Sequence, residues 1–327
     1  MFLKEVVRLP DELALERLLV PQAQLRDDHR RLRLKVLIIP TSHRKDSRPD
    51  SQPGTARGYS EAMRENSLKA LFTRGGVAVN GWLAIPSPIS AEAMAHAGFD
   101  SLTIDLQHGA VGFEAAVTML QAISTTDVVP MCRVPWNEPS AIMRLLDAGS
   151  YGVICPMINN REEAEALVGA CRYPPAGHRS FGPNRVRFYA GADYGLEANE
   201  VVLVFAMIET RAGLENLESI LDTPGLNGVY VGPSDLSLAL GGPPGGDWEE
   251  GPAAEAIEVV VEATRQRGLV PGIHNASPGY ALRMIEKGFQ LVTVQNDLAY
   301  LGEQARRVTA AVRGGSQGRG GGSSDPY

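Results

Sequence analysis

The sequence predicts a single (β/α)8 barrel, and three observations support this fold class. Short apolar runs alternate eight times with amphipathic, helix-like stretches. Strands that are apolar at every position are typical of a parallel sheet that is buried on both faces. Eight such units within about 250 residues favour a closed barrel over an open sheet. An open nucleotide-binding sheet is the alternative. However, no G-x-G-x-x-G follows the first strand and G-x-x-x-x-G-K-[ST] does not occur, so no nucleotide cofactor is expected.

The elements follow one another in a regular order. The predicted strands are residues 77–85, 101–107, 128–134, 151–157, 201–209, 228–233, 269–275 and 291–297. A helix-like stretch such as SAEAMAHAG or PGYALRMIEKG follows each strand, and several of these stretches close with glycine, a common helix stop. The segment GGPPGGD lacks the Lys-Ser/Thr of a phosphate-binding loop, and it is predicted to be a flexible loop after the sixth strand.

Composition divides the chain into three regions. Residues 1–62 are rich in Arg, Asp, Ser and Pro and predict a poorly ordered extension, although the apolar run at 34–40 could form an added strand. Residues 63–313 form the predicted barrel, and the Gly-rich residues 314–327 predict a disordered tail. Met63 opens the regular part and is a candidate start of the protein, a hypothesis that a native mass measurement tests.

The overall composition excludes several classes of protein. Hydrophobic residues make up 44% and charged residues 21%, which is ordinary for a globular protein with a large core. The formal net charge of -7 argues against nucleic acid or an anionic membrane as the main partner. No apolar run reaches the roughly 18 residues of a membrane span, and the N-terminus lacks the pattern of a secretory signal. The three cysteines have no C-x-x-C spacing, which fits a reducing cytoplasm.

Two carboxylates are the first candidates for chemistry. Glu209 and Asp235 each follow an apolar strand, and the side chains at the C-terminal strand ends of such a barrel carry the active site. Carboxylates from neighbouring strands, with water completing the site, suit a hard cation such as Mg²⁺ or Mn²⁺. The alternative is that each one caps the helix after its strand, which is plausible for Asp235.

Other polar residues end neighbouring strands. An aspartate three residues before a histidine, as in Asp105 and His108, could hold one imidazole tautomer for proton transfer, or the histidine could only bind a loop backbone. Arg133 could bind a carboxylate or an enolate oxygen, or form a salt bridge across the barrel mouth. Trp82 is a candidate for substrate stacking, but rim packing is favoured for it, and a structural role is favoured for His274.

The lysines restrict the class of aldolase that the chain could be. An aldolase without a metal forms an imine with a lysine. From residue 64 onward, the only lysines are Lys69, in the helical entry segment, and Lys287, at the end of the helix before the eighth strand. Neither position is near the C-terminal strand ends. An aldolase built on this chain would therefore use a metal ion.

Five stretches resemble stretches of a known protein family and occur in the same order as in that family. They are GWLAIPSPISAEAMAHAGFDSLTIDLQHG, CRVPWNEPSAIMRLLDAG, RYPPAGHRSFG, AMIETRAGLENLESIL and GVYVGPSDLSLALG. The chain from about Asn66 to Arg313 resembles the HpcH/HpaI aldolase family of the phosphoenolpyruvate/pyruvate-barrel superfamily. That family includes aldolases for 4-hydroxy-2-oxoheptanedioate and for 2-keto-3-deoxy sugar acids. The resemblance implies cleavage of a 4-hydroxy-2-oxo acid to pyruvate and an aldehyde, with Mg²⁺, Mn²⁺ or Co²⁺. It also implies a homo-hexamer, a trimer of dimers.

The resemblance also implies roles for individual residues. Glu209 and Asp235 would hold the metal, and Asp105 and His108 would transfer the proton. Arg133 would contact the keto and enolate oxygen, and the backbone of Gly232, Pro233 and Ser234 would bind the pyruvate carboxylate. Asp147 would reach a neighbouring subunit's site. The chain departs from common family residues at Gln107, Met207 and Ser234, which puts the substrate in doubt. The competing readings are a lyase for CoA esters, similar to the citrate lyase β subunit, and a non-catalytic barrel subunit.

Overall fold

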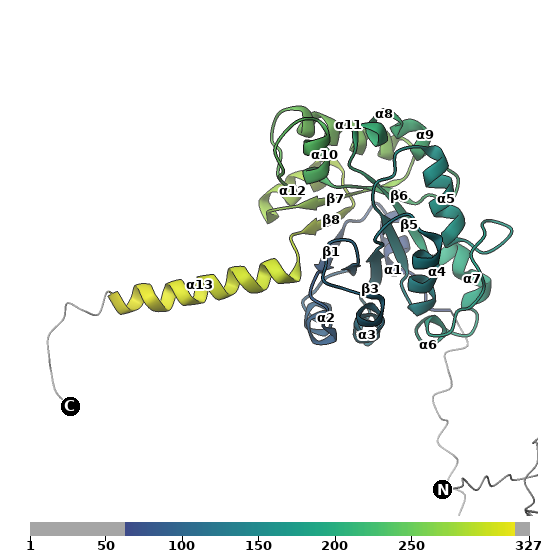
Figure 1. Cartoon of the computed structure of the whole chain (residues 1–327), viewed down its shortest axis with the longest axis horizontal. Helices are drawn as coiled ribbons and strands as arrows, with labels where there is room; N and C mark the ends of the chain where they lie inside the picture. The colour runs from purple at the N-terminus through teal and green to yellow at the C-terminus, as the bar shows by residue number, and fades with distance from the viewer. Residues whose placement is uncertain (1–62, 318–327) are drawn as a thin grey trace, which may run out of the picture. The chain divides into compact units, whose positions relative to one another are not determined.

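The computed structural model describes residues 63–317, so the predicted extension, its possible strand at 34–40 and the last ten residues lie outside the described part. Eight parallel strands close into a barrel in chain order, with the last strand paired to the first (Figure 1). The predicted (β/α)8 fold is thereby confirmed. The strands are β1 (Ala78–Leu83), β2 (Ser101–Asp105), β3 (Val129–Arg133), β4 (Gly152–Cys155), β5 (Leu203–Ile208), β6 (Gly228–Val231), β7 (Val270–Asn275) and β8 (Leu291–Val294).

Helices connect consecutive strands, and their ends follow local sequence signals. Ser87, Asn160 and Ser277 cap helix N-termini through their side chains, and Gly149 and Gly288 end helices in the left-handed conformation. The helices are α1 (Ser67–Thr73), α2 (Pro88–Ala95), α3 (Phe113–Ile123), α4 (Pro139–Ala148), α5 (Arg161–Cys171), α6 (Val186–Ala190), α7 (Tyr194–Val201), α8 (Arg211–Glu215), α9 (Leu217–Leu221), α10 (Pro233–Ala239), α11 (Pro252–Gln266), α12 (Pro278–Lys287) and α13 (Asp297–Gln317).

The strands separate two cores, because successive side chains point to opposite faces of a strand. Residues such as Ile104 and Val153 point outward and pack against the helices. Residues of the other parity, including Phe205 and Tyr230, fill the barrel interior. Asp105 and Arg133 end their strands and are paired in register, and their side chains are hydrogen-bonded to each other at the barrel mouth.

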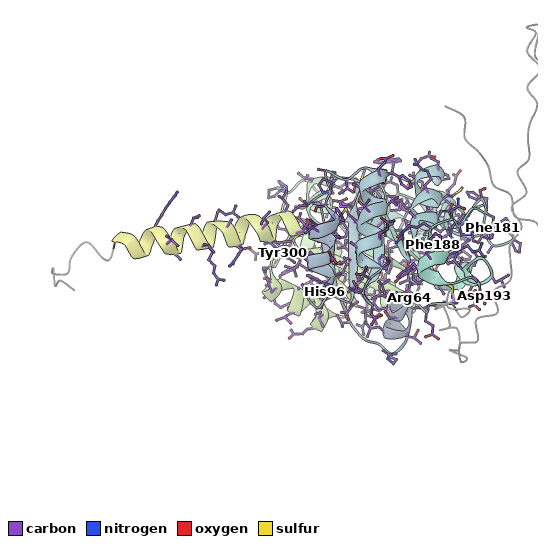
Figure 2. The ribbon with its side chains drawn as sticks, turned by 90° about the horizontal axis from the view of Figure 1, so that it is seen from below. Arg64, His96, Phe181, Phe188, Asp193 and Tyr300 are labelled. Carbon is purple, nitrogen blue, oxygen red and sulfur yellow. The ribbon has the colours of Figure 1, made fainter. Side chains whose placement is uncertain are left out.

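Two segments depart from a simple alternation of strand and helix. Between α5 and β5 the chain forms a loop and the helices α6 and α7, and Phe181 in the loop and Phe188 on α6 are exposed on the same side of the molecule (Figure 2). The final helix, α13, leaves the barrel after its first turn (Figure 1), and it stays helical through Gln317, beyond the predicted start of the tail at 314. Among the described helices, none combines the length and the apolar composition needed to cross a bilayer.

Candidate active site

A buried ion pair forms the centre of the barrel mouth. The Arg133 guanidinium donates from Nε to Asp105 Oδ1 at 2.8 Å and from Nη2 to Oδ2 at 2.7 Å. Both residues are almost fully buried, at 3% exposure for Asp105 and 9% for Arg133. A two-point contact between a planar guanidinium and a carboxylate fixes the orientation of both groups. The salt bridge that the sequence left open as an alternative for Arg133 is therefore present.

Asp105 is saturated with donors. Besides Arg133, the backbone N–H groups of Gln107 and His108 donate to its Oδ1 at 3.0 and 3.2 Å. Burial alone would raise the pKa of Asp105. Hydrogen bonds and the charge from Arg133, with help from the His108 backbone and the Trp82 side chain, instead lower that pKa below its usual value. Asp105 is thus a fixed anion that organises the mouth, and it is poorly suited to accept a proton.

His108 reaches Asp105 through its backbone and not through its ring. The sequence suggested that Asp105 orients the imidazole, but the hydrogen bond joins Asp105 to the backbone N–H of His108. The reason is the tight turn after β2, which folds the backbone of residues 107 and 108 over the carboxylate. The His108 side chain is exposed at the mouth, where a substrate can reach it.

Glu209 is the second buried carboxylate of the mouth. It directly follows β5, is only 2% exposed, and accepts the Met157 backbone N–H at 2.8 Å through Oε1. Burial raises its pKa to about 7; the Met157 N–H and Arg133 oppose the rise, and the charge of Asp235 adds to it. Because Asp235 acts on Glu209 electrostatically, the structure brings the two predicted metal carboxylates near each other. Asp235 itself is exposed in the first turn of α10.

The residues present fit a hard divalent cation. Glu209 is held in a dry position where its ionised form is costly, and a cation offsets that cost. Position 232 must be glycine for this arrangement, because a Cβ there would lie 2.4 Å from Glu209 Oε2. Within residues 63–317, no group of three or more His, Cys, Asp or Glu side chains could hold a metal. A cation here would have two protein carboxylates, with water or substrate supplying its other ligands.

The turn between β6 and α10 forms the floor beside Glu209. Gly232 and Pro233 are buried and Ser234 is half-buried, with Gly232 preceding the first residue of α10. The first turn of a helix leaves backbone N–H groups without partners inside the helix, and these groups favour an anion. The predicted carboxylate-binding backbone therefore lies next to the predicted metal carboxylates.

Asp147 lies away from the mouth of its own barrel. It is in the last turn of α4, just before β4 begins, and so near the N-terminal ends of the strands. The buried Arg179 donates to its Oδ1 at 2.6 Å. Of the residues predicted for the site, Asp147 is the one that the structure does not place near the others.

Trp82 and His274, both considered from the sequence, lie beneath the mouth together with Tyr230, which the sequence did not single out. Trp82 is 3% exposed, and its ring contacts the Arg133 guanidinium, with Arg133 Cζ 4.9 Å from the ring centroid. Tyr230 and His274 pack against the same ring. The two-residue alternation along β6 and β7 would have placed both inside the barrel. No sequence signal points to Met157, which has a φ of 58° and directs its N–H at Glu209.

Comparison with known proteins gives a consistent result. The family model for HpcH/HpaI aldolase/citrate lyase matches residues 80–298. The chain belongs to this family. It is 42% identical to the hydroxypyruvate/pyruvate aldolase of Rhizorhabdus wittichii, over 76% of this chain and 99% of that protein. It is 39% identical to the 4-hydroxy-2-oxo-heptane-1,7-dioate aldolase of Klebsiella pneumoniae, over 75% of this chain and 93% of that protein.

A solved structure agrees with these sequence relatives. An HpcH/HpaI aldolase/citrate lyase family protein from Burkholderia cenocepacia superimposes with a TM-score of 0.71 at 32% identity, over 76% of this chain and 99% of that one. The predicted family is thus confirmed. Aldolase relatives at this identity, over most of the chain, make this member of the HpcH/HpaI family a carbon–carbon lyase. The alternative of a non-catalytic subunit loses its support.

Proposed function

We propose that this HpcH/HpaI family member is a class II aldolase that reversibly cleaves a 4-hydroxy-2-oxo acid into pyruvate and an aldehyde. The observation that carries the proposal is the pair of carboxylates at the mouth. Glu209 is buried with a pKa raised to about 7, and Asp235 lies near enough to add to that rise. Two carboxylates held together in this way, next to the fixed Arg133, repel each other when both are ionised. A bound cation would offset this repulsion and the cost of burying an ionised Glu209. The aldolases among the relatives support the reaction class.

The lysines support a metal over an imine. Within the described residues, Lys69 pairs with Glu200 and Lys287 pairs with Glu258, both on the outer surface of the barrel. No other lysine occurs between residues 63 and 317. An imine would need a lysine amine at the C-terminal strand ends, where the polar residues of the mouth converge.

Each residue of the mouth has a task in the proposed reaction. A divalent cation held by Glu209 and Asp235 supplies Lewis-acid stabilisation of negative charge on the substrate oxygens. The backbone of Gly232, Pro233 and Ser234 binds the carboxylate of the oxo acid. Arg133, oriented by Asp105, donates to the oxygen on which charge develops, and such prearranged donors are a major source of catalysis.

His108 handles the proton in this proposal. In the cleavage direction its imidazole takes the proton of the C4 hydroxyl while the C3–C4 bond breaks. The C4–O electrons form the aldehyde carbonyl, and the electron pair of the broken bond remains on the three-carbon fragment as its enolate. Protonation of the methylene carbon then gives pyruvate. The exposed position of His108 at the mouth suits this exchange of protons.

We also propose that the enzyme works as a homo-oligomer, a hexamer built as a trimer of dimers. Beyond its first turn α13 exposes Leu301, Val308 and Val312, and a helix with exposed apolar residues gains by packing on a partner. Asp147 lies far from its own mouth, which suits a role at a neighbouring subunit. Sedimentation of the purified protein tests the assembly, and a monomer at micromolar concentration would contradict it.

A reducing compartment such as the cytoplasm suits the cysteines. Cys132, Cys155 and Cys171 are free and buried. Burial raises the pKa of Cys132 and of Cys171 to about 12, so neither thiol is reactive at neutral pH.

The first experiment is deuterium exchange into the methyl group of pyruvate, followed by NMR. It tests formation of the enolate without any knowledge of the aldehyde. We expect exchange with Mg²⁺ or Mn²⁺, loss of exchange with EDTA, and recovery when the metal is restored. Glu209→Gln should lose the exchange, whereas its matched control Glu258→Gln, which removes an exposed carboxylate on α11, should leave the rate unchanged. No exchange by folded, metal-loaded enzyme would refute the pyruvate reaction.

A further inference from the structure

We propose that the hydroxyl group of Tyr230 is a positioning group for the aldolase reaction: acting through the ring of Trp82, it holds the Arg133 guanidinium in place. The proposal rests on the proposed function, because the position of Arg133 matters for catalysis only if Arg133 stabilises charge on a substrate oxygen. Tyr230 does not touch the mouth itself. It lies in the middle of β6, points into the barrel and is fully buried.

Trp82 connects Tyr230 to the mouth. The two rings are stacked, with centroids 5.6 Å apart and planes 25° apart. Arg133 Cζ lies 4.9 Å from the centroid of the same Trp82 ring, and the Trp82 side chain also helps to lower the pKa of Asp105. Trp82 therefore interacts with both partners of the central ion pair. A displacement of this ring would change the position of the guanidinium, because interiors pack too tightly for one group to move alone.

A buried hydrogen-bond network fixes Tyr230 from below. Its hydroxyl donates to Thr293 Oγ1 at 2.7 Å and lies 3.5 Å from His274 Nδ1. The Asn80 amide donates to the same Thr293 oxygen at 2.9 Å. Asn80 in turn accepts the hydroxyl of Ser101 at 2.8 Å. The network joins β1, β2, β6, β7 and β8, so the orientation of the Tyr230 ring is set by five strands.

His274 completes the support of Trp82. Its ring meets the Trp82 ring edge-on, with centroids 5.3 Å apart and planes 86° apart. Burial, with a contribution from the charge of Arg133, lowers the pKa of His274 to about 4, so the ring is neutral near pH 7. A neutral ring packs beside Arg133 without repelling it.

A phenylalanine would fill the space of Tyr230 equally well, which makes the hydroxyl informative. Burying a hydroxyl in an apolar core is unfavourable unless it forms hydrogen bonds, and even then the net gain in stability is small. A barrel interior that needed only volume would use apolar rings, as it does at Phe205. The hydroxyl therefore serves orientation: it restricts the rotation and tilt of the ring against which Trp82 is stacked.

The test compares Tyr230→Phe with a matched variant, Tyr151→Phe. Tyr151 is also fully buried in the inner core, and its hydroxyl donates to the Arg64 carbonyl at 3.0 Å, far from the mouth. Both variants lose one buried hydroxyl and its hydrogen bond, so similar losses in melting temperature are expected. At saturating pyruvate, Tyr230→Phe should slow methyl exchange by about 10- to 100-fold, because small misplacements of a catalytic group carry penalties of that order.

Further variants and measurements distinguish a positioning role of the Tyr230 hydroxyl from a purely structural role. Thr293→Val should reproduce the rate loss of Tyr230→Phe, and the double variant should lose no more, since both changes break the same contact. The half-saturating pyruvate concentration should change much less than the rate, because Arg133 acts on charge that develops in the reaction. Equal exchange rates for Tyr230→Phe and Tyr151→Phe would overturn the proposal.

Failure of the proposed function gives a different pattern. In that case the wild-type enzyme itself does not exchange the methyl protons, and crystal structures of the wild type and of Tyr230→Phe decide the question of position. The proposal expects Trp82 and the Arg133 guanidinium to shift in the variant. Superimposable side chains in the two structures would reject it.

Discussion

Among residues 63–317, two nearly buried arginines each bind one aspartate, and the two pairs behave differently. At the mouth, Arg133 binds Asp105 through two hydrogen bonds. On the far side, Arg179 binds Asp147 through one hydrogen bond at 2.6 Å, and its guanidinium lies over the rings of Tyr173, just after α5, and Tyr194, in α7. Asp105 has its pKa lowered, whereas burial raises the pKa of Asp147 despite the arginine bond.

The difference teaches what each aspartate is free to do. Asp105 accepts two backbone N–H groups in addition to Arg133, so its oxygens are fully used within its own chain. Asp147 accepts one hydrogen bond from within the described part of the chain, and its side chain keeps 25% of its exposure. Asp105 is a fixed structural anion for Arg133. Asp147 has an oxygen left over, which fits the proposal that it serves a neighbouring subunit.

The largest expected effect comes from applying one change to both arginines. Arg133→Met leaves Asp105 as an unpaired charge in a buried site, which typically costs about 3–5 kcal/mol of unfolding free energy. Arg179→Met should cost less, about 2 kcal/mol, because water can reach Asp147. Only Arg133→Met should also slow methyl exchange, by about 100- to 1,000-fold, since it removes a donor to developing charge. Urea unfolding and the exchange assay measure the two effects.

Equal stability losses for the two methionine variants would show that the pairs are energetically alike. A large loss of exchange in Arg179→Met, in protein whose assembly is intact, would show that the far pair belongs to the chemistry of the mouth.

Glu209 extends the comparison to a buried carboxylate that has no arginine bond. Its folded pKa of about 7 lies above its usual 4.5, so the folded protein binds this proton more tightly than the unfolded chain does. Without metal, stability should therefore fall as the pH rises from 4.5 to 7, by on the order of 3 kcal/mol. Glu209→Gln cannot ionise. It should be more stable than the metal-free wild type at pH 8 and nearly equal to it at pH 4.5.

Metal should reverse this order. Mn²⁺ should stabilise the wild type at pH 8 and weaken in affinity as the pH falls below 7, while Glu209→Gln should gain little from Mn²⁺ and lose methyl exchange. Thermal unfolding with Mn²⁺ and with EDTA measures both variants. A wild type whose metal-free stability is flat between pH 4.5 and 8 would contradict the burial of an ionised Glu209.

The barrel was predictable because its signals repeat. Eight apolar strands with helices between them left few alternatives, and Asp105, Arg133 and Glu209 stand at or just after the C-terminal ends of their strands, where the active site of such a barrel lies. Glycine stops at Gly149 and Gly288 also followed the sequence. The excursion through α6 and α7 and the projecting α13 were not predicted, because short helices and helix directions depend on contacts that no local pattern records.

The structure brings most of the predicted residues together at the mouth, but it connects them differently from what the spacing suggested. Spacing suggested that Asp105 orients the His108 ring, whereas the structure gives the carboxylate to the His108 backbone and to Arg133. Which donors bind the Asp105 carboxylate depends on the turn after β2 and on the register of β2 with β3, and neither can be read from residue spacing. The contact of Met157 with Glu209 depends on a positive φ that a methionine rarely adopts, so no sequence rule would have suggested it.

The smallest expected effect comes from replacing each aspartate by asparagine. Asp105→Asn removes a carboxylate whose pKa is lowered in the fold; its contribution is present above the usual pKa of 3.8 and is lost as the pH falls through the folded pKa. Asp147→Asn removes a carboxyl whose pKa is raised by burial, so the stability that this group contributes is present at low pH and is lost as the pH rises through its folded pKa. At pH 7, Asp105→Asn should therefore destabilise the protein by about 3 kcal/mol, and Asp147→Asn by less than about 1 kcal/mol. Urea unfolding at pH 7 and at pH 4 resolves the two. If Asp147→Asn proved as costly as Asp105→Asn, Asp147 would be a full structural partner of Arg179, with no oxygen to spare for a neighbour.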